Sequence, residues 1–466
     1  MIEPIIEELD RPPPPEAVFN SLRIYRNSFF LDSSGGSEKF GRFSFLGCEP
    51  FLIFKSKRDS VTLETPDGTT EILKANPFLV LKDILEKHKI IAPIGEKTPF
   101  PCGAAGYFAY DLKDFVEKLP DTAVDDLNLP DCVLGFYDTV VTYDNLKKKA
   151  YISGLSAKRL GEFKKRIFKK EAVRTASFLP PRPRPLRSNF SKASYMEAIK
   201  KAKLYIKKGD IYQVNLSQRF EADIGAVKPH LVYSRLRNVS PAPFSSYLGF
   251  EDVTILSSSP ERFLSKFGSH IETRPIKGTR PRGRNEAEDK LLERELVESP
   301  KDNAEHIMIV DLERNDLGRI CEYGSVRPAE SAVLEKYANV FHLVSTVKGV
   351  LKKGVGPVDC LMAAFPGGSI TGAPKIRSME IIEELEPVKR SAYTGAIGYI
   401  SFNGNMDTSI VIRTLLVKGR KAYFSVGGGI VADSVPEEEY EETLDKAKGL
   451  MIALGIEAGK EELVIA

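Results

Sequence analysis

The chain has 466 residues, of which 42% are hydrophobic and 28% are charged, and its formal net charge is +3. This composition is ordinary for a globular protein, and so small a net charge gives no argument for a nucleic-acid partner. The length exceeds that of one small core, so we expect two packed lobes or one large composite domain. No run of about 18 apolar residues occurs, so we expect no membrane span.

The N-terminal segment, MIEPIIEELDRPPPP, is acidic and rich in proline. It lacks the basic start and apolar run of a secretion signal. The chain has five cysteines without a CxxC pair, at positions 48, 102, 132, 321 and 360. An odd, scattered set favours neither a disulfide framework nor a zinc site, and it suits a reducing compartment. We therefore expect a cytoplasmic protein.

The N-terminal part, residues 1–175, has strand-like segments at Phe51–Phe54 and Thr139–Tyr143 and a helical pattern around Pro77–His88. Residues 176–190 contain four prolines and three arginines, a composition that excludes a regular helix or a central strand. This segment is predicted to link the N-terminal part to a C-terminal part, residues 191–466.

The C-terminal part alternates between helix and strand signals. Helical spacing begins at Ser194, and Gly209 is the predicted stop, while the alternation over 211–220 predicts a strand. Two charged helices are then predicted over 286–299 and 302–313, and a loop leading into a helix over 371–385. Three strands are predicted over 391–402, 406–417 and 421–431, and a last helix over 437–455. Clustered strands with helices between them predict a mixed α+β fold rather than a strict βαβ alternation.

Two acidic pairs lie on predicted helices. Asp302 and Glu305 are three residues apart, and so are Glu439 and Glu442, which puts each pair on one helix face. If the two faces meet, they would form an oxygen-only site of the kind that holds Mg²⁺ with water in the remaining positions. Because such pairs are usually solvated surface, the spacing alone leaves both interpretations open.

The segment RPIKGTRPRG, 274–283, crowds basic residues into a stretch punctuated by proline and glycine. We expect a fixed loop here, and its arginines, Arg274, Arg280 and Arg282, would suit a carboxylate-rich ligand. A desolvated Lys277 would have a lowered pKa and a nucleophilic amine. The alternative is an ordinary solvent-facing lysine.

Three other features are weak when taken alone. The run Gly427, Gly428, Gly429 ends a predicted strand, where a turn could bind an anion or simply form a bend. In PGGSITGAPK, 366–375, small and hydroxyl residues precede a helix start, which is a second candidate anion site. His342 lies in the apolar VFHLVS, where a lone histidine is more often a core residue.

The order of the motifs is more specific than any one of them. RPIKGTRPRG, AEHIMIVDLERNDLG, FPGGSITGAPKIRSMEIIEEL, GAIGYIS, SIVIRT, GGGIVADS and EYEETLDKA together resemble the chorismate-binding enzyme family. FFLDSSGGSEKFGRFSFLGCEP resembles the N-terminal region of its amino-acid-synthase branch. The resemblance implies the α+β fold of anthranilate synthase component I, with two large, mostly antiparallel sheets packed as a sandwich and helices outside.

The resemblance also implies roles for individual residues. The implied Mg²⁺ ligands are Glu305 and Glu442, with Asp302 and Glu439 in support. The implied chorismate-binding residues are Gly278, Thr279, Tyr399, Arg413, Gly427, Gly428 and Gly429. The implied catalytic residues are Lys277, Glu261, His342 and Ser369.

Two positions separate the reactions of the family. Gln213 stands where the water-adding members have a lysine base, and an amide cannot deprotonate water at neutral pH. Lys277 stands where anthranilate synthases usually have alanine, and the pattern PIKGT resembles that of aminodeoxychorismate synthases. In those enzymes this lysine is thought to attack C2 of chorismate. Glu261 matches the acid that protonates the departing C4 hydroxyl. The resemblance thus implies aminodeoxychorismate synthase component I, which makes 4-amino-4-deoxychorismate for 4-aminobenzoate and folate. Anthranilate synthase component I is the alternative, and an inactive scaffold is a third, disfavoured by the intact acidic and basic positions.

No cysteine lies in a GxCxG-type nucleophile turn, so the resemblance implies a separate glutamine amidotransferase subunit as the source of ammonia. Asp32 and Ser33, with Pro243, Phe244 and Ser245, fall where anthranilate synthases have their tryptophan pocket. Both halves of that pattern are altered here. The pocket could bind an amino acid or stay empty.

Overall fold

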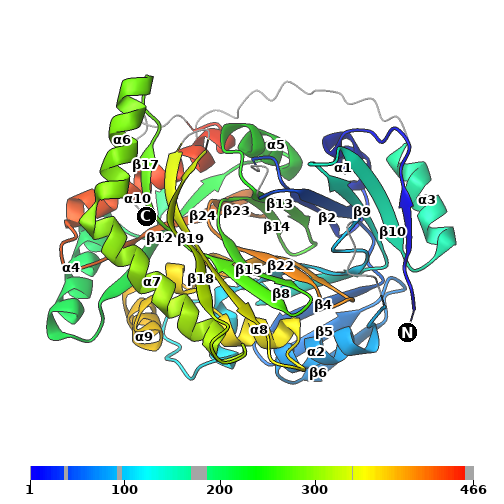
Figure 1. The fold of residues 1–466 in the computed structure, drawn as a ribbon, viewed down its shortest axis with the longest axis horizontal. Coiled ribbons are helices and arrows are strands. Elements are labelled where there is room, and N and C mark those ends of the chain that lie inside the picture. The colour runs from blue at the N-terminus through cyan, green and yellow to red at the C-terminus, as the bar shows by residue number, and fades with distance from the viewer. Residues whose placement is uncertain (1, 36–39, 92–96, 169–185, 338–339, 457–466) are drawn as a thin grey trace.

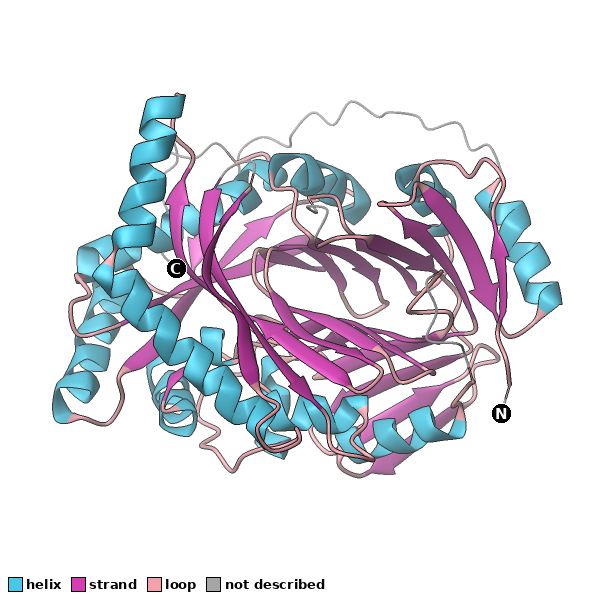
Figure 2. Cartoon of the chain, in the orientation of Figure 1, coloured by secondary structure: helices cyan, strands magenta, loops and turns pink. Residues whose placement is uncertain are grey.

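The computed structural model describes residues 2–35, 40–91, 97–168, 186–337 and 340–456. Two large, twisted antiparallel sheets face each other, and the helices lie outside them (Figures 1 and 2). Each sheet has 12 strands within the described residues. The predicted fold class, an α+β sandwich of two mostly antiparallel sheets, is confirmed.

The first sheet includes strands β24 and β12, which carry the predicted site residues Gly427–Gly429 and the residue Gln213. The two-residue strand β20 (Gly372–Ala373) pairs with β12 beside the main path. From edge to edge the strands are β1 (Ile5–Glu8), β10 (Lys149–Gly154), β9 (Thr139–Asp144), β3 (Phe43–Gly47), β2 (Ser28–Asp32), β13 (Phe244–Gly249), β14 (Thr254–Ser259), β23 (Thr414–Lys418), β24 (Lys421–Ile430), β12 (Gln213–Asp223) and β11 (Arg187–Ser188).

The second sheet has strand β17 at one edge, and this strand carries the predicted site residues Lys277, Gly278 and Thr279. Strand β18 (Arg327–Lys336) pairs with β19 beside the main path. The order is β17 (Ile276–Pro281), β19 (Val340–Val350), β16 (His270–Arg274), β15 (Arg262–Phe267), β22 (Met406–Ile410), β21 (Ala396–Ser401), β7 (Gly103–Phe108), β8 (Cys132–Tyr137), β4 (Leu52–Lys57), β5 (Ser60–Glu64) and β6 (Thr70–Lys74).

Both sheets contain strands from both parts of the chain. In the first sheet β2 pairs with β13, and in the second β7 pairs with β21, so residues 1–175 and 191–466 share their cores. Residues 176–185 of the predicted linker lie outside the described residues. The remainder of that segment, from Leu186, includes strand β11.

The helices cover the outer faces of the sheets. Those against the first sheet are α1 (Pro15–Leu22), α3 (Ala157–Ile167), α4 (Lys192–Lys208), α5 (Pro229–Val239), α9 (Lys375–Leu385) and α10 (Pro436–Leu454). Those associated with the second sheet are α2 (Pro77–Lys87), α6 (Glu286–Glu298), α7 (Pro300–Gly318) and α8 (Pro357–Ala364). Two short 3₁₀ helices are η1 (Tyr110–Phe115) and η2 (Gly368–Ile370).

The helix boundaries follow local signals in the sequence. Ser191 caps α4 by accepting a hydrogen bond from the N–H of Ser194, and Gly209 ends it with φ 82°, a left-handed conformation that favours glycine. Ser299 caps α7 by accepting from the N–H of Asp302. The predicted helices over 77–88, 194–209, 286–299, 302–313 and 437–455 are confirmed, with ends that differ by up to five residues. The predicted loop leading into a helix over 371–385 is confirmed as well, since α9 begins at Lys375.

Three local predictions were wrong. Residues 406–417 form two strands rather than one, because the chain passes from β22 in the second sheet to β23 in the first, with Arg413 at φ 53° in the connection. Residues 276–281 are strand β17 rather than a loop, since they pair with β19. The run Gly427–Gly429 is not a turn, because it lies inside β24 and pairs with β12.

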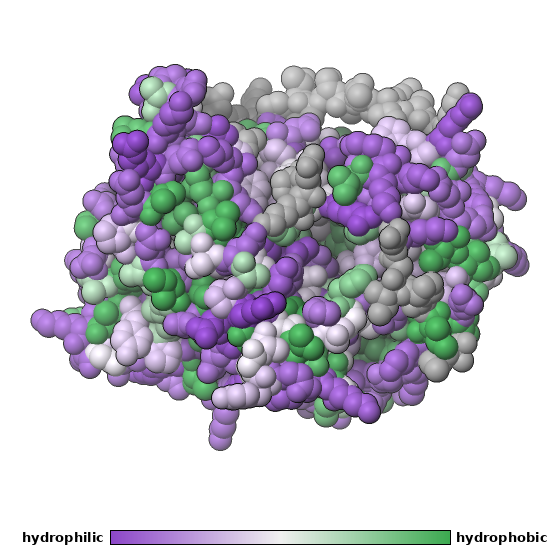
Figure 3. All heavy atoms as spheres, viewed as in Figure 1, coloured by the Kyte–Doolittle hydropathy of each residue, from purple (hydrophilic) through white to green (hydrophobic). Residues whose placement is uncertain are grey.

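The surface agrees with the composition. The face shown in Figure 3 is mainly hydrophilic, with scattered apolar patches. No helix within the described ranges is both long and apolar enough to cross a membrane. The five cysteines are buried and carry free thiols.

Candidate active site

Lys277, which is partly buried on β17, and Glu261, which is buried just before β15, lie near each other at the second sheet. The N–H of Ile276, the residue before Lys277, donates to Oε1 of Glu261 over 3.4 Å. Burial raises the pKa of Glu261 to about 7, although a hydrogen bond from Ser369 and the charge of Lys277 both act to lower it. Burial also lowers the pKa of Lys277, against the opposing pull of Glu305 and Glu261. A carboxylic acid that is half protonated near neutrality therefore faces a desolvated amine.

The glycine after Lys277 creates a bulge that shapes this edge. Lys277 pairs with Leu343 of β19 and Thr279 pairs with His342, so Gly278 is the extra residue. It has φ 81°, and a Cβ atom there would lie 2.9 Å from Cδ1 of Leu296. The bulge thus requires glycine for both conformation and space.

His342 lies next to this bulge as a neutral imidazole. Its Nδ1 hydrogen-bonds to Oγ1 of Thr279 at 2.9 Å. Burial and, to a smaller extent, the nearby cation Arg413 together lower the pKa of His342 to about 3. His342 therefore offers a neutral hydrogen-bonding group at neutral pH rather than a positive charge.

Gln213 and Gly429 bring the first sheet against Lys277. Nε2 of Gln213 donates to Oε2 of Glu305 over 3.2 Å. A Cβ atom on Gly429 would lie 2.1 Å from Nε2 of Gln213 and 3.5 Å from Nζ of Lys277. Glycine at 429 therefore leaves room for the Gln213 side chain, whereas Lys277 would be in ordinary contact with the added atom.

Two carbonyl oxygens at this wall have no hydrogen-bond donor. Gln213 is 1% exposed and Asn215 is 9% exposed, and Oε1 of the first and Oδ1 of the second are unpartnered among the described residues. The two residues alternate along β12 and so share one face of the sheet. A buried acceptor without a donor costs about 1–3 kcal/mol, so a bound molecule with N–H or O–H groups would stabilise this wall.

The two acidic helix faces do meet. Nζ of Lys301, one residue before Asp302, lies 3.8 Å from Oε1 of Glu439, and the charge of Glu439 acts together with burial to raise the pKa of Glu305. Burial raises the pKa of Glu439 as well, and the like charge of Glu442 adds to the effect. Carboxylates from α7 and α10 are therefore close enough to repel one another.

Each acidic residue already has a partner of its own. Asp302 accepts from Nη2 of Arg280 at 2.9 Å, and Glu439 accepts from Oγ of Ser434 at 2.6 Å. Burial tends to raise the pKa of Glu442, but the ion pair with Lys446, at 2.6 Å, holds it below its ordinary value.

The donor chemistry of these helices fits a hard cation. Glu305 and Glu442 offer oxygen ligands only, and one or two carboxylates with water are the usual protein share of a Mg²⁺ site. No three His, Cys, Asp or Glu side chains in the described part of the chain converge closely enough to complete a site by themselves. The residues present therefore fit an ion whose remaining positions are taken by water or substrate.

Arg413 and Tyr393 form the next part of the site. Arg413 donates to the carbonyl of Lys446 at 3.1 Å, and Nζ of Lys446 donates to the carbonyl of Gly427 at 2.8 Å. Burial lowers the pKa of Arg413, and the neighbours that oppose this shift are Tyr393 and Glu442. The left-handed backbone of Arg413 is a strained conformation for an arginine, which is typical of functional sites.

The sequence identified Arg413 but missed Tyr393. Tyr393 is buried and lies within the electrostatic reach of Arg413. It stands in SAYTG, just before the glycine that precedes β21, and a tyrosine in a turn was the only signal. The tyrosine implied by the resemblance, Tyr399, lies elsewhere.

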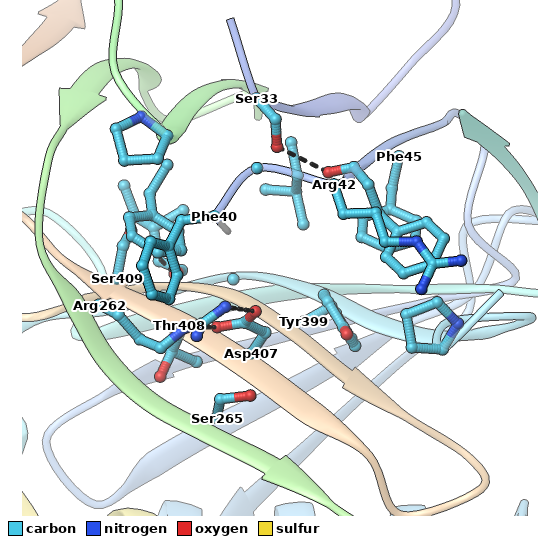
Figure 4. Close-up of a pocket in the computed structure, with 18 of the residues that line it drawn as sticks. Ser33, Phe40, Arg42, Phe45, Arg262, Ser265, Tyr399, Asp407, Thr408 and Ser409 are labelled. Carbon is cyan, nitrogen blue, oxygen red and sulfur yellow. Dashed lines mark hydrogen bonds and ion pairs between the residues drawn. The ribbon is translucent and has the colours of Figure 1, made fainter. Parts of the chain in front are cut away.

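Tyr399 belongs to a second cavity, of about 690 Å³, between the two sheets (Figure 4). Its ring stacks on Phe100 with centroids 4.4 Å apart and meets Phe45 edge-on at 5.1 Å. Its charged neighbours are Asp407 and Arg262, which pair with each other at 2.9 Å. The structure therefore does not bring Tyr399 to the Lys277 site.

The predicted effector-pocket residues line this same cavity. Ser33, Pro243, Phe244 and Ser245 all contribute to its wall. Oγ of Ser33 donates to the carbonyl of Phe43 at 2.7 Å (Figure 4). The two segments, far apart in sequence, thus meet as the sequence predicted, and the occupant of the cavity stays a prediction.

Comparison with known proteins agrees with this architecture. The family model described as chorismate binding enzyme matches residues 27–452. The chain is 41% identical to an anthranilate synthase component 1 of Acetivibrio thermocellus, over 96% of this chain and 93% of that protein. It is also 41% identical to an aminodeoxychorismate synthase component 1 of Salmonella typhimurium, over 95% of this chain and 96% of that protein.

A solved structure gives the same result. Anthranilate synthase component I of Streptococcus pneumoniae superimposes with a TM-score of 0.78 at 32% identity, covering 88% of this chain and 92% of that one. The fold, the two acidic helix faces and the partly buried lysine therefore occur in a chain that belongs to the family of chorismate-binding enzymes.

Proposed function

We propose that this protein converts chorismate and ammonia into 4-amino-4-deoxychorismate, as an aminodeoxychorismate synthase component I in the route to 4-aminobenzoate and folate. The observation that carries the proposal is the position of Lys277, which is partly buried and within electrostatic reach of the buried Glu261. Desolvation favours the neutral amine of Lys277, which is the nucleophilic form, and it favours the protonated form of Glu261, which is the acid.

In the first step the lone pair of Lys277 Nζ forms a bond to C2 of chorismate. The ring double bonds shift, the C4–O bond breaks, and the departing oxygen takes the proton of Glu261 and leaves as water. In the second step ammonia adds to C4, the double bonds shift back, and the C2–Nζ bond breaks. The added nitrogen returns a proton to Glu261, so that lysine and acid are both restored.

Gln213 and Asn215 support ammonia as the incoming nucleophile. Their buried carbonyl oxygens lack donors, and ammonia has three N–H groups to give while keeping its lone pair for C4. Gln213 cannot act as the base that water would need, whereas ammonia is nucleophilic without one.

We further propose that Glu305 and Glu442 hold Mg²⁺, with Asp302 and Glu439 beside them. When bound, the ion would supply positive charge to a carboxylate of chorismate. The chain itself would help to bind that anion through the partly buried guanidinium of Arg413. Thr279, His342, Ser369 and the glycine run would then complete the walls around the ring.

The nitrogen donor would be a partner subunit with glutamine amidotransferase activity. The relatives are named as component 1, which implies a second component. The alternative function is anthranilate synthase component I, because relatives of both names match this chain at 41% identity. Lys277 is the residue that favours the first function.

Product identity tests the proposal. The purified chain is incubated with chorismate, Mg²⁺ and ammonium at mildly alkaline pH, and the products are separated by liquid chromatography. We expect 4-amino-4-deoxychorismate without release of pyruvate. Anthranilate and stoichiometric pyruvate as the main products would assign the chain to the alternative function.

A further inference from the structure

Glu313 is a buried carboxylic acid that the proposed reaction does not use. It lies on α7, about two turns beyond Glu305, and its side chain is 2% exposed. Oε1 accepts a hydrogen bond from the N–H of Gly368 at 2.9 Å. Oε2 accepts from Oγ1 of Thr273 at 3.4 Å. The carboxyl group thus joins two separate segments of the chain.

Both of these segments hold Glu261. Gly368 precedes Ser369, whose hydroxyl acts on the Glu261 carboxyl group to lower its pKa. Thr273 lies three residues before Ile276, whose N–H donates to Oε1 of Glu261 at 3.4 Å. Every hydrogen bond to the acid therefore comes from a segment that Glu313 anchors, among the contacts that the described residues make.

The local sequence permits this close approach. A Cβ atom on Gly368 would lie 3.0 Å from Oε1 of Glu313 and 2.7 Å from Cδ2 of Leu312. Glycine at 368 is what lets the turn reach the carboxyl group. The turn follows Pro366, and its own 3₁₀ helix, η2, is buried throughout.

The charges around Glu313 leave it without a cation of its own. Lys375, on α9, pairs with Asp316 at 2.5 Å and donates to the carbonyl of Ala364 at 3.0 Å. Burial and then Asp316 raise the pKa of Glu313 to about 7, Lys375 lowers it, and Glu261 contributes a further rise. The titratable groups that face Glu313 are thus Asp316 on its own helix, Lys375 on α9 and Glu261 before β15.

We propose that Glu313 is a positioning residue for Glu261, which it acts on by anchoring the Gly368–Ser369 turn and the end of β16. This inference rests on the proposed function to the extent that Glu261 is the acid of that reaction. Without Glu313, the Ser369 hydroxyl and the Ile276 N–H lose their common support, and the acid loses its orientation toward the leaving group. Glu313 also affects the pKa of Glu261 through its charge, because a neighbouring carboxylate favours the protonated form of Glu261.

Two variants of the full-length chain separate these effects. E313A removes both acceptors, and we expect kcat for chorismate consumption to fall about 30- to 100-fold, within the range of a misplaced general acid. We expect KM for chorismate to change less than about threefold, since Glu313 does not reach the substrate. E313Q keeps an acceptor for Gly368, and we expect it to recover most of kcat below pH 7.

The dependence of kcat on pH distinguishes positioning of Glu261 from a merely structural role of Glu313, because a structural role would not shift the basic limb of the profile. Glu261 acts as an acid, so activity is present below its pKa and is lost as pH rises through it. E313Q removes a carboxyl group that favours protonated Glu261, so we expect the basic limb of kcat to move to lower pH by about half a unit or more. D311N, an exposed carboxylate on the same helix, is the matched control and should leave both limbs in place.

If E313A does not fold, T273V removes one of the two donors without changing charge, and we expect a fall of about three- to tenfold in kcat. Two results together would overturn the proposal. The first is that E313Q keeps wild-type kcat and the basic limb of its pH profile does not move. The second is that E313A or T273V also keeps wild-type kcat. The ratio of variant to wild type is read from chorismate loss whichever product forms. Anthranilate from the wild type would therefore refute the proposed function without deciding the role of Glu313.

Discussion

The backbone N–H of Ile276 donates to Oε1 of Glu261 over 3.4 Å, which ties the proposed acid to the residue directly before the proposed nucleophile. Lys277 lies on β17 and Glu261 lies directly before β15, and the chain between these strands brings Ile276 back to the Glu261 carboxyl group. The amine of Lys277 and the carboxyl group of Glu261 also interact electrostatically. The first two predictions test these two groups in turn.

Lys277→Ala should lower the rate of amination at least about 100-fold, because the amine that forms the C2 bond is lost. The measurement is 4-amino-4-deoxychorismate formed per minute with saturating ammonia and Mg²⁺. Lys290→Ala, at an exposed position on α6, is the control and should behave as wild type. Unchanged turnover in the Lys277 variant would reduce this lysine to an electrostatic role.

The activity should depend on pH through Glu261, whose pKa is raised by burial to about 7. The protonated acid is the working form, so kcat at saturating free ammonia should be highest below pH 7 and fall as pH rises through that value. The ammonia concentration must be calculated as the unprotonated form at every pH. Glu261→Gln should be slow throughout, without this basic limb, and a wild-type profile that keeps rising above pH 8 would contradict the assignment.

Chelation of divalent ions should abolish activity, and Mg²⁺ should restore it. Glu305→Gln should raise the Mg²⁺ concentration needed for half-maximal activity by about 10-fold or more, because one anionic oxygen ligand becomes a neutral amide. Glu441→Gln, one residue before Glu442 and paired with Lys192 at the surface, is the matched control. Full activity in the presence of a chelator would remove the metal from the proposal.

The glycine run should tolerate a methyl group at one position and not at the next. On Gly428 a Cβ atom would lie 3.1 Å from the flexible end of Glu439, whereas on Gly429 it would lie 2.1 Å from Nε2 of Gln213. We expect Gly428→Ala to keep activity within about threefold and Gly429→Ala to lose most of it, since Gln213 must be displaced. Thermal unfolding of both variants distinguishes a local clash from loss of the fold.

Asn215→Val should weaken the use of ammonia specifically. The buried carbonyl of Asn215 lacks a donor, and an unmet hydrogen bond of this kind corresponds to about 1–3 kcal/mol. We expect KM for ammonia to rise about 10-fold while KM for chorismate stays within about twofold. Equal changes in the two constants would place Asn215 at the chorismate side of the site instead.

The sequence alone determined the elements and the family. Periodic apolar residues, capping serines and terminal glycines are local signals, so α4, α7 and α10 could be predicted closely from their own residues. The acidic pairs could be assigned to helix faces for the same reason. Motif order was enough to identify the chorismate-binding family and, with it, most of the residues at the site.

Only the tertiary structure decided which of these residues meet. The packing of the two sheets puts Lys277 near Glu261 and Gly429. It also places Tyr399 in a different cavity, while Tyr393 lies near Arg413. The break at Arg413 and the bulge at Gly278 follow from packing between strands, which no local pattern encodes. Burial of the acids and amines also depends on that packing, so the altered pKa values on which the proposed chemistry rests belong to the fold and not to any single motif.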